Sequence, residues 1–212
     1  MNVTIIGTGN MARGIASRLV AGGHGVSFVG RDAAKAEQLA AEVRNGAPGA
    51  EAGAASLADG LRNQVVVLAL PYDAALDFAR DNAAALAGKT VVDITNPLNA
   101  TYDGLVTEPG SSAAEKIAAL LPGTKVVKAF NTTFAGTLVS GVVHGEPLDV
   151  LVAADDGAAK AEVLRLVADG GLRAIDAGKL DRARTLEGLA LLGITLQGPL
   201  GLGFQSAWKL VA

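Results

Sequence analysis

A glycine-rich turn near the start of the chain limits the fold more than any other feature of the sequence. It follows a short apolar run, residues 3–6, and precedes a segment with helical patterning, residues 11–20. The first glycine of the pattern G-x-G-x-x-[GA] allows a tight turn, and the second lets the backbone approach a pyrophosphate. Between a strand and a helix, this pattern predicts a dinucleotide site. The expected contacts are Gly7, Thr8, Gly9, Asn10 and Met11.

The residues after the second predicted strand indicate which dinucleotide binds. In NAD-binding proteins an Asp or Glu at the end of this strand usually holds the ribose 2′-hydroxyl. Here Gly30 takes that place, Arg31 follows it, and Lys35 comes one helical turn later. The Arg31 guanidinium can form two hydrogen bonds with a 2′-phosphate, to which Lys35 adds a positive charge and Thr8 a hydroxyl. We therefore expect NADP(H).

The alternative is that Asp32 binds the ribose of NAD(H) and that Arg31 is a solvated surface charge. Asp32 stands directly before a predicted helix, residues 33–43, where an N-cap is needed. Aspartate is among the preferred N-cap residues, so Asp32 has a structural role available. This favours NADP(H) over NAD(H).

Composition excludes several kinds of site. The 212 residues include no cysteine, and the only histidines are His24 and His144. Disulfides, thiol nucleophiles and metal sites rich in cysteine or histidine are therefore excluded. The net charge of −3 gives no basic surplus for nucleic acid. We expect small-molecule partners and no metal.

The sequence shows no sign of a membrane protein. The most apolar segment, residues 186–204, is interrupted by Gly193, Gln197 and Pro199, unlike a membrane span. No stretch resembles a signal peptide, so we expect a cytoplasmic protein without membrane association.

Strand and helix patterns alternate along the chain, which predicts an α/β fold of the doubly wound Rossmann type with a mainly parallel sheet. The expected strands are residues 3–6, 26–29, 50–53, 64–70, 90–94, 125–129, 148–153 and 173–176. The expected helices are residues 11–20, 33–43, 72–86, 112–121 (capped by Ser111) and 158–168. Residues 64–70 hold an unbroken apolar run, as expected of a strand buried on both faces.

The chain is expected to divide near residue 178. Residues 1–178 form the predicted dinucleotide-binding domain with its extended sheet. Residues 179–212 form a small C-terminal cap, a helical hairpin that completes an acceptor pocket. Its apolar positions could form a dimer interface or pack within the chain. They are Leu186, Leu189, Leu192 and Ile194.

Three predicted strands end in segments that could contact a cofactor, since ligands of open α/β sheets lie beyond the carboxyl ends of the strands. These segments contain Leu70 and Pro71, Asn96 and Pro97, and Asn131 and Thr132. Amide and hydroxyl groups there could orient a nicotinamide carboxamide. For Asn96 and Pro97 a plain turn is an equal alternative, because Asn-Pro is a common turn signal. For Asn131 and Thr132 we favour a site.

Acid–base residues are scarce, and we assign no catalytic residue. His24 lies in a glycine-rich turn at the sheet edge opposite the cofactor, which favours a structural role. His144 lies in a loop before Pro147 and is more typical of the surface than of a site. Hydride exchange between two bound rings needs alignment rather than an acid or a base. The scarcity therefore favours cofactor-to-cofactor hydride transfer.

The chain resembles the NADPH:coenzyme F420 oxidoreductase family over essentially its whole length. The matching pieces are the glycine turn with Gly30, Arg31 and Lys35, residues 111–115 and 125–127, and residues 172–178 followed by 184–187. The resemblance implies a Rossmann domain with a small C-terminal part that closes over a deazaflavin, commonly as a homodimer.

The resemblance further implies that Thr8, Arg31 and Lys35 hold NADP and that hydride passes directly between nicotinamide and deazaflavin. A flavin takes the place of the deazaflavin in membrane ferric reductases that contain the same module. For the phosphate and polyglutamate tail of coenzyme F420, Lys128 is placed to act, and few other basic residues are. An NADPH-dependent reductase of small imines or carbonyl compounds is one alternative, and a non-catalytic NADP(H) sensor is the other.

Overall fold

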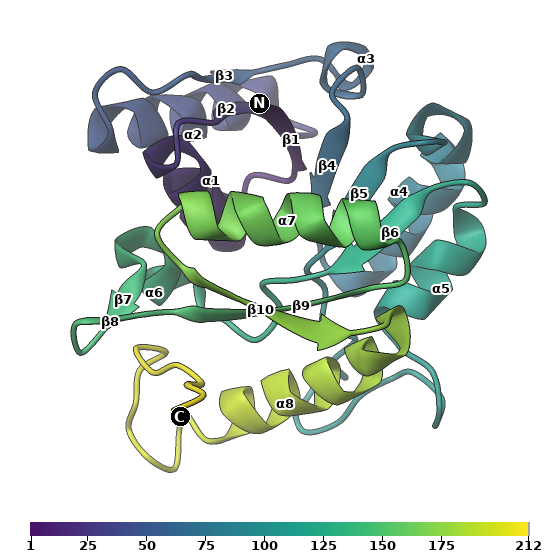
Figure 1. Ribbon diagram of the computed structural model, residues 1–212, viewed down its shortest axis with the longest axis vertical. Helices are drawn as coiled ribbons and strands as arrows, with labels where there is room; N and C mark the ends of the chain where they lie inside the picture. Colours follow the sequence, from purple (N-terminus) through teal and green to yellow (C-terminus); the bar gives the residue numbers. More distant parts are fainter. Residues whose placement is uncertain (212) are drawn as a thin grey trace.

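An eight-stranded sheet runs through the centre of the computed structural model, which describes residues 1–211 (Figure 1). The strands follow the order β10-β9-β6-β5-β4-β1-β2-β3. Their bounds are β1 Asn2–Ile6, β2 Gly25–Val29, β3 Ala52–Ala54, β4 Val65–Leu68, β5 Thr90–Asp93, β6 Lys125–Lys128, β9 Asp149–Ala154 and β10 Arg173–Gly178. All neighbours pair in parallel except β9 with β6. The predicted Rossmann-type, mainly parallel fold is confirmed.

Helices cover both faces of the sheet. The longer ones are α1 Asn10–Ala21, α2 Ala33–Gly46, α4 Tyr72–Leu86, α5 Ala113–Leu120, α7 Gly157–Asp169 and α8 Ala183–Thr195. In Figure 1, α1, α2 and α7 lie on one side of the sheet, and α4 and α5 lie on the other. The C-terminal α8 follows a short 3-10 helix, Leu180–Arg182, and contacts α5.

Strand β4 explains why the sheet needs two hydrophobic cores. Its side chains alternate between the two faces: Val65 and Val67 belong to the core under α1, α2 and α7. Val66 and Leu68 belong to the core under α4 and α5. Because both faces are covered, the strand can be apolar at every position, as the sequence predicted.

Several local elements differ from the prediction. Short elements not foreseen are α3 Leu57–Gly60, α6 Ala135–Ser140 and a hairpin of β7 Val142–Val143 with β8 Glu146–Pro147. The expected cap Ser111 is wrong: Ser112 caps α5, since its Oγ accepts from the Glu115 backbone N at 3.2 Å. The Glu115 carboxylate in turn accepts from the Ser112 hydroxyl at 2.7 Å, which holds the cap in place.

The second helix expected after α8 is wrong. Helix α8 ends at Thr195, and the chain then forms turns up to residue 205, with left-handed backbone at Gly201, Gly203 and Phe204. Such backbone interrupts a right-handed helix, and Pro199 removes a donor. Gln197 holds the turns together, because its Nε2 donates to Gly193 O at 2.7 Å and its Oε1 accepts from Phe204 N at 2.9 Å.

Gly14 is predicted to be required by the packing of α1 against α6. A Cβ atom there would lie 2.7 Å from Leu138 Cβ and 3.0 Å from Ala135 O. Gly14→Ala should therefore destabilise the fold by about 1–3 kcal/mol. Gly188→Ala is the matched control, because Gly188 is also inside a helix, but a Cβ atom there would meet nothing within 4 Å among residues 1–211. It should stabilise by about 0.5–1 kcal/mol. Urea unfolding measures both, and equal shifts would contradict the role of Gly14 in packing.

Candidate functional site

The glycine turn after β1 has the backbone that close approach of a ligand requires. Gly7 has a φ of +118°, and a Cβ atom there would collide with the Ala69 carbonyl oxygen, so only glycine fits. The Gly7 N–H donates to Val29 O at 2.8 Å, which fixes the turn against β2. Gly9 precedes α1, and in the described part of the chain nothing lies within 4 Å of a Cβ position on it. The N-terminus of α1 is therefore open to a ligand.

The end of β2 lies beside this turn. A Cβ atom on Gly30 would approach Thr8 Cγ2 to 2.8 Å, so Thr8 stands directly over the position where an NAD-type acid would begin. Asp32 caps α2: its Oδ1 accepts from the backbone N of Ala34 at 2.9 Å and of Lys35 at 3.2 Å. Arg31 and the Lys35 side chain are exposed. The carboxylate of Asp32 is thus engaged by its own helix.

Two asparagines join the ends of β5 and β6. Asn131 Nδ2 donates to Asn96 Oδ1 at 3.0 Å, and Asn96 Nδ2 donates to Asn131 O at 2.9 Å. Asn131 follows Phe130, whose φ is +61°, and is only 4% exposed. Its Oδ1 is buried and accepts no hydrogen bond among residues 1–211. Buried acceptors of this kind usually have a partner, so Asn131 presents an acceptor for a ligand.

A cavity of about 710 Å³ opens beside the two asparagines. Its walls come from α1, from the loops after β5 and β6, and from the C-terminal segment. The lining residues are Met11, Asn96, Thr101, Tyr102, Asp103, Asn131, Thr133, Phe134, Ala135, Ile194, Thr195 and Phe204. A second cavity, of about 530 Å³, lies between α1 and α2 and contains none of the predicted site residues.

The structure brings only some of the predicted site residues to this cavity. Met11, Asn96 and Asn131 line it. Thr132 is buried without lining it, and Thr133 lines it instead. The remaining predicted residues lie outside its wall: Gly7, Thr8, Gly9, Asn10, Arg31, Lys35, Leu70, Pro71 and Pro97. The turn residues and the cavity thus form two adjoining halves, linked by Met11 at the start of α1.

Sequence analysis missed the loop after β5, which supplies Thr101, Tyr102 and Asp103. Asn99 organises this loop, because its Oδ1 accepts from the backbone N of Asp103 at 3.1 Å and its Nδ2 donates to Asp103 Oδ1 at 2.7 Å. The dipeptide Asp103-Gly104 is a turn signal that could have found the loop, though not its place over the cavity. On the opposite wall, Phe134 and Phe204 meet edge to face, with ring centroids 5.3 Å apart.

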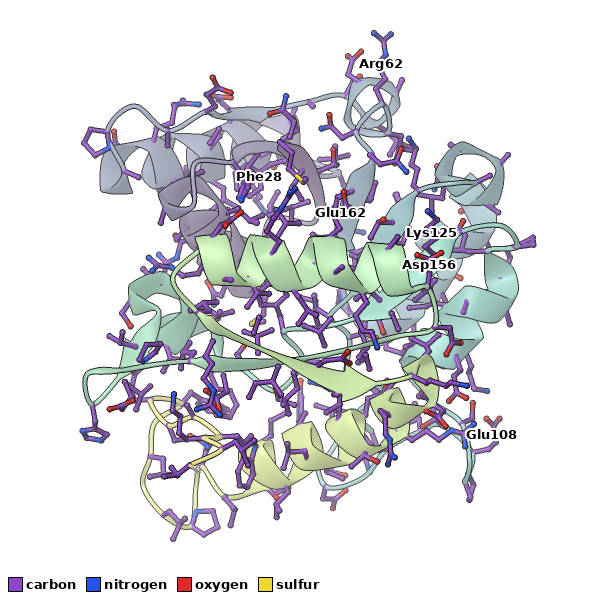
Figure 2. All side chains as sticks on the ribbon, in the orientation of Figure 1. Phe28, Arg62, Glu108, Lys125, Asp156 and Glu162 are labelled. Carbon is purple, nitrogen blue, oxygen red and sulfur yellow. The ribbon has the colours of Figure 1, made fainter. Side chains whose placement is uncertain are left out.

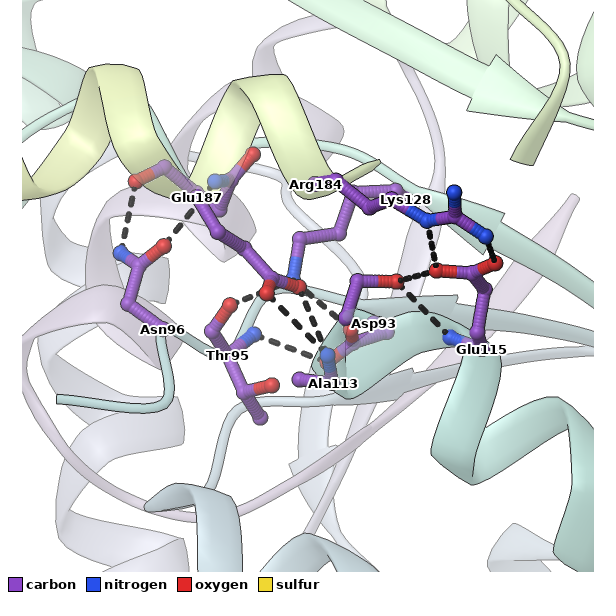
Figure 3. Close-up of polar contacts among 10 residues, drawn as sticks. Asp93, Thr95, Asn96, Ala113, Glu115, Lys128, Arg184 and Glu187 are labelled. Carbon is purple, nitrogen blue, oxygen red and sulfur yellow. Dashed lines mark hydrogen bonds and ion pairs between the residues drawn. The ribbon is translucent and has the colours of Figure 1, made fainter. Parts of the chain in front are cut away.

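A buried ionic cluster lies behind the site (Figure 3). Lys128 is fully buried, and its Nζ donates to Asp93 Oδ2 at 2.9 Å, to Glu187 Oε1 at 2.8 Å and to the Thr95 carbonyl oxygen. Glu187 also accepts from the backbone N of Ala113, at the start of α5. Burial raises the pKa of Glu187, and the neighbouring Lys128 ammonium opposes that rise.

This cluster corrects the expectation for Lys128. Because all three of its donor directions end on Asp93, Glu187 and Thr95, Lys128 has no proton left for an anionic ligand. Instead it joins β5, β6, α5 and α8. A second ion pair, between Arg184 and Glu115, links α8 to α5 nearer the surface, with Nε to Oε2 at 2.9 Å.

The histidines lie away from the cavity. His24 is 8% exposed, and its Nε2 is 3.1 Å from Asp169 Oδ2, at the end of α7. Its Nδ1 is 3.3 Å from the N-terminal amino group, so it holds segments together, as expected. His144 is exposed at the tip of the β7–β8 hairpin. Over residues 1–211, we find no cluster of three or more side chains that could ligate a metal.

The fold and the glycine turn place the chain among the Rossmann-type oxidoreductases. Residues 2–97 match the family model described as "NADP oxidoreductase coenzyme F420-dependent". The chain is 32% identical to the F420-dependent NADP reductase of Methanocaldococcus jannaschii in an alignment of 211 residues, and the alignment covers 93% of each chain. It is also 30% identical to Metalloreductase STEAP3 of Rattus norvegicus, over 89% of this chain and 36% of that one.

Comparison with solved structures gives a consistent result. A crystal structure from Arthrobacter sp. FB24, provisionally assigned as an F420-dependent NADP reductase, superimposes with a TM-score of 0.85 at 30% identity and covers 99% of both chains. An imine reductase of Streptomyces aurantiacus shares the fold, with a TM-score of 0.66 at 20% identity over 96% of this chain and 64% of that one. The chain belongs to the coenzyme F420-dependent NADP oxidoreductase family, whose members are enzymes. In residues 1–211, no helix has the length and apolar character needed to cross a bilayer.

Lys128 is predicted to be essential for stability. Lys128→Met would leave two carboxylates, those of Asp93 and Glu187, in a buried site without their counter-charge, which should cost about 3–5 kcal/mol. Lys125→Met is the control. Lys125 is on the same strand, but it is half-exposed and its Nζ is 4.0 Å from Asp156 Oδ2 (Figure 2), so less than about 1 kcal/mol is expected. Guanidinium unfolding measures both free energies. A loss at Lys128 no larger than that at Lys125 would contradict the role of the cluster.

Proposed function

We propose that this protein transfers a hydride between NADP(H) and a deazaflavin, such as coenzyme F420, or a flavin. The observation that carries the proposal is the adjoining arrangement of a dinucleotide turn and a ligand-sized cavity, joined at Met11 and the Asn96–Asn131 pair. The names of the relatives agree with it: F420-dependent NADP reductase for the archaeal protein and metalloreductase for the rat protein.

The residues present fit NADP(H). The open space at Gly9 and the N-terminus of α1 suit a pyrophosphate. At the adenosine end, Gly30 offers no acid and Asp32 is engaged as a helix cap, which leaves Arg31, Lys35 and Thr8 to bind a 2′-phosphate. Leu70 and Pro71, which follow β4, complete the expected path of the cofactor across the strand ends.

The Asn96–Asn131 pair fits the nicotinamide end. Asn131 Oδ1 is a buried acceptor that a carboxamide N–H could satisfy, and the hydrogen bonds with Asn96 fix its orientation. Pro97 and Thr132, which directly follow Asn96 and Asn131 in the sequence, would support the two asparagines. When bound, reduced NADP supplies the hydride that the acceptor takes up. The protein's own part is to hold the two rings in contact and to exclude water with Phe134 and Phe204.

Hydride transfer needs alignment of the two rings and no acid or base. The part of the cavity wall formed by residues 1–211 contains no histidine, lysine or arginine, and its ionisable side chains are Tyr102 and Asp103. Its large apolar side chains, Met11, Phe134, Ile194 and Phe204, offer flat or flexible surface to a planar ring. We propose that residues 179–212 act as a cap that completes this acceptor pocket on the 1–178 domain. Ile194, Thr195 and Phe204 are its contribution.

We also propose a homodimer. Leu186 is buried inside the chain, but Leu192 on the same helix is 49% exposed, and Leu200 is 61% exposed. A partner subunit that packs against this segment would cover both side chains. Analytical ultracentrifugation tests the dimer. The cytoplasmic location stays a prediction.

Steady-state oxidation of NADPH tests the function. The acceptors are coenzyme F420, FMN, riboflavin and a small cyclic imine, each supplied separately. The proposal predicts turnover with a deazaflavin or a flavin. Turnover with the imine alone would identify a small-substrate reductase, and NADPH binding without turnover of any acceptor would identify a sensor. Either result would overturn the proposal.

Arg31 is predicted to select NADP(H). Arg31→Ala should raise the Kd of NADPH about tenfold to a hundredfold, which corresponds to one or two charge-assisted hydrogen bonds, and leave the Kd of NADH nearly unchanged. Arg62→Ala is the control, because Arg62 is an exposed arginine in a separate part of the chain (Figure 2). Fluorescence titration measures each Kd, and equal weakening of both cofactors would contradict the assignment.

A further inference from the structure

The cavity wall carries one charged side chain, and it is an acid. Among the lining residues that the structure describes, only Asp103 is ionisable with a charge at neutral pH. Thr101 Oγ1 donates to Asp103 Oδ1 at 2.6 Å, and Asn99 Nδ2 donates to the same oxygen at 2.7 Å. These hydrogen bonds lower the pKa of Asp103 below its ordinary value, so the carboxylate stays ionised at neutral pH.

Three basic residues of the neighbouring elements are already paired, and Arg13 on α1 lines the cavity between α1 and α2 instead. Lys128 is buried in its cluster with Asp93 and Glu187. Arg184, on the helix that lines the cavity, is bound to Glu115. Lys209, in the C-terminal segment, is 3.0 Å from Asp149 Oδ1. The wall formed by residues 1–211 therefore offers a negative charge, and no positive one, to an acceptor.

In this cavity, the ring of a flavin or deazaflavin acceptor and its side chain would therefore meet different surroundings. The ring system is planar, which suits the apolar and amide groups of the cavity. A phosphate on a side chain that lies within this cavity would gain no ion pair from the wall and would be repelled by Asp103, most strongly at low ionic strength. FMN and the complete deazaflavin coenzyme carry such a phosphate, whereas riboflavin and the ribityl deazaflavin without its tail do not.

We propose that the acceptor site recognises the isoalloxazine or deazaflavin ring with an uncharged side chain, and that Asp103 disfavours acceptors whose side chain ends in a phosphate. The inference rests on the proposed function, since it concerns the same cavity. It differs from that proposal because it assigns a substrate class within the flavins and a residue that sets the preference.

The experiment compares KM within two pairs: riboflavin with FMN, and ribityl deazaflavin with coenzyme F420. At low ionic strength the uncharged member of each pair that turns over should have the lower KM, by about two- to fivefold, the size expected of an interaction between solvent-exposed charges. Added salt at about 0.3 M should reduce the ratio towards one, because it screens the repulsion. An equal or lower KM for the phosphorylated member at low salt would overturn the inference.

Variants identify the residue responsible. Asp103→Asn should bring the KM ratio close to one at low salt, and Asp103→Lys should reverse it. Asp81→Asn is the matched control, since Asp81 is an exposed aspartate on α4, outside the cavity, and it should keep the wild-type ratio. An unchanged ratio in both Asp103 variants would overturn the role of Asp103. The salt dependence of the unmodified protein tests the charge effect even if the loop rearranges in a variant. Failure of the proposed function gives a separate result, namely no turnover with any flavin or deazaflavin.

Discussion

One buried ammonium group, that of Lys128, joins the ends of β5 and β6 to α8. Lys128 is the last residue of β6, Asp93 is the last residue of β5, and Glu187 is on α8, so the charges meet where the strands end. A buried lysine is tolerated only when its charge is paired and its protons are bound. The same ammonium binds the Thr95 carbonyl, and Thr95 directly precedes Asn96 (Figure 3). The cluster therefore fixes both the position of α8 and the turn that carries the cavity's asparagine.

The sheet order makes the site a meeting point of remote segments. Strands β1, β4, β5 and β6 are neighbours, so their carboxyl ends bring residues 7, 70, 96 and 131 to one edge. The reversed strand β9 then leads the chain back, so that β10 delivers α8 to the same edge. The glycine turn and the cavity beside Asn96 and Asn131 can thus adjoin although their residues come from both ends of the chain.

Local patterns predicted the glycine turn and the cap of α2, and contacts between distant residues determined much of the remaining structure. The glycine turn and the Asp32 cap depend on a few neighbouring residues, and both formed as expected. The sequence suggested a ligand contact for Lys128, but the structure pairs it with Glu187, which is 59 residues away. No pattern near Lys128 along the chain could have predicted a partner that distant. The prediction of a second C-terminal helix was wrong for a related reason. Its apolar residues suggested a helix, but the glycines and the hydrogen bonds of Gln197 stabilise a series of turns instead.

Because of the ionic cluster, we expect α8 to be held more firmly than the turns around Tyr102 and Phe204. Undocking α8 would strand Lys128 beside one carboxylate in an apolar interior, so we expect this helix to unfold only with the whole domain. The segments around Tyr102 and Phe204 are held by hydrogen bonds of Asn99 and Gln197 rather than by buried charges. Both residues are at least half-exposed and have left-handed backbone. We therefore expect uptake and release of ligands to depend on these two turns rather than on movement of α8.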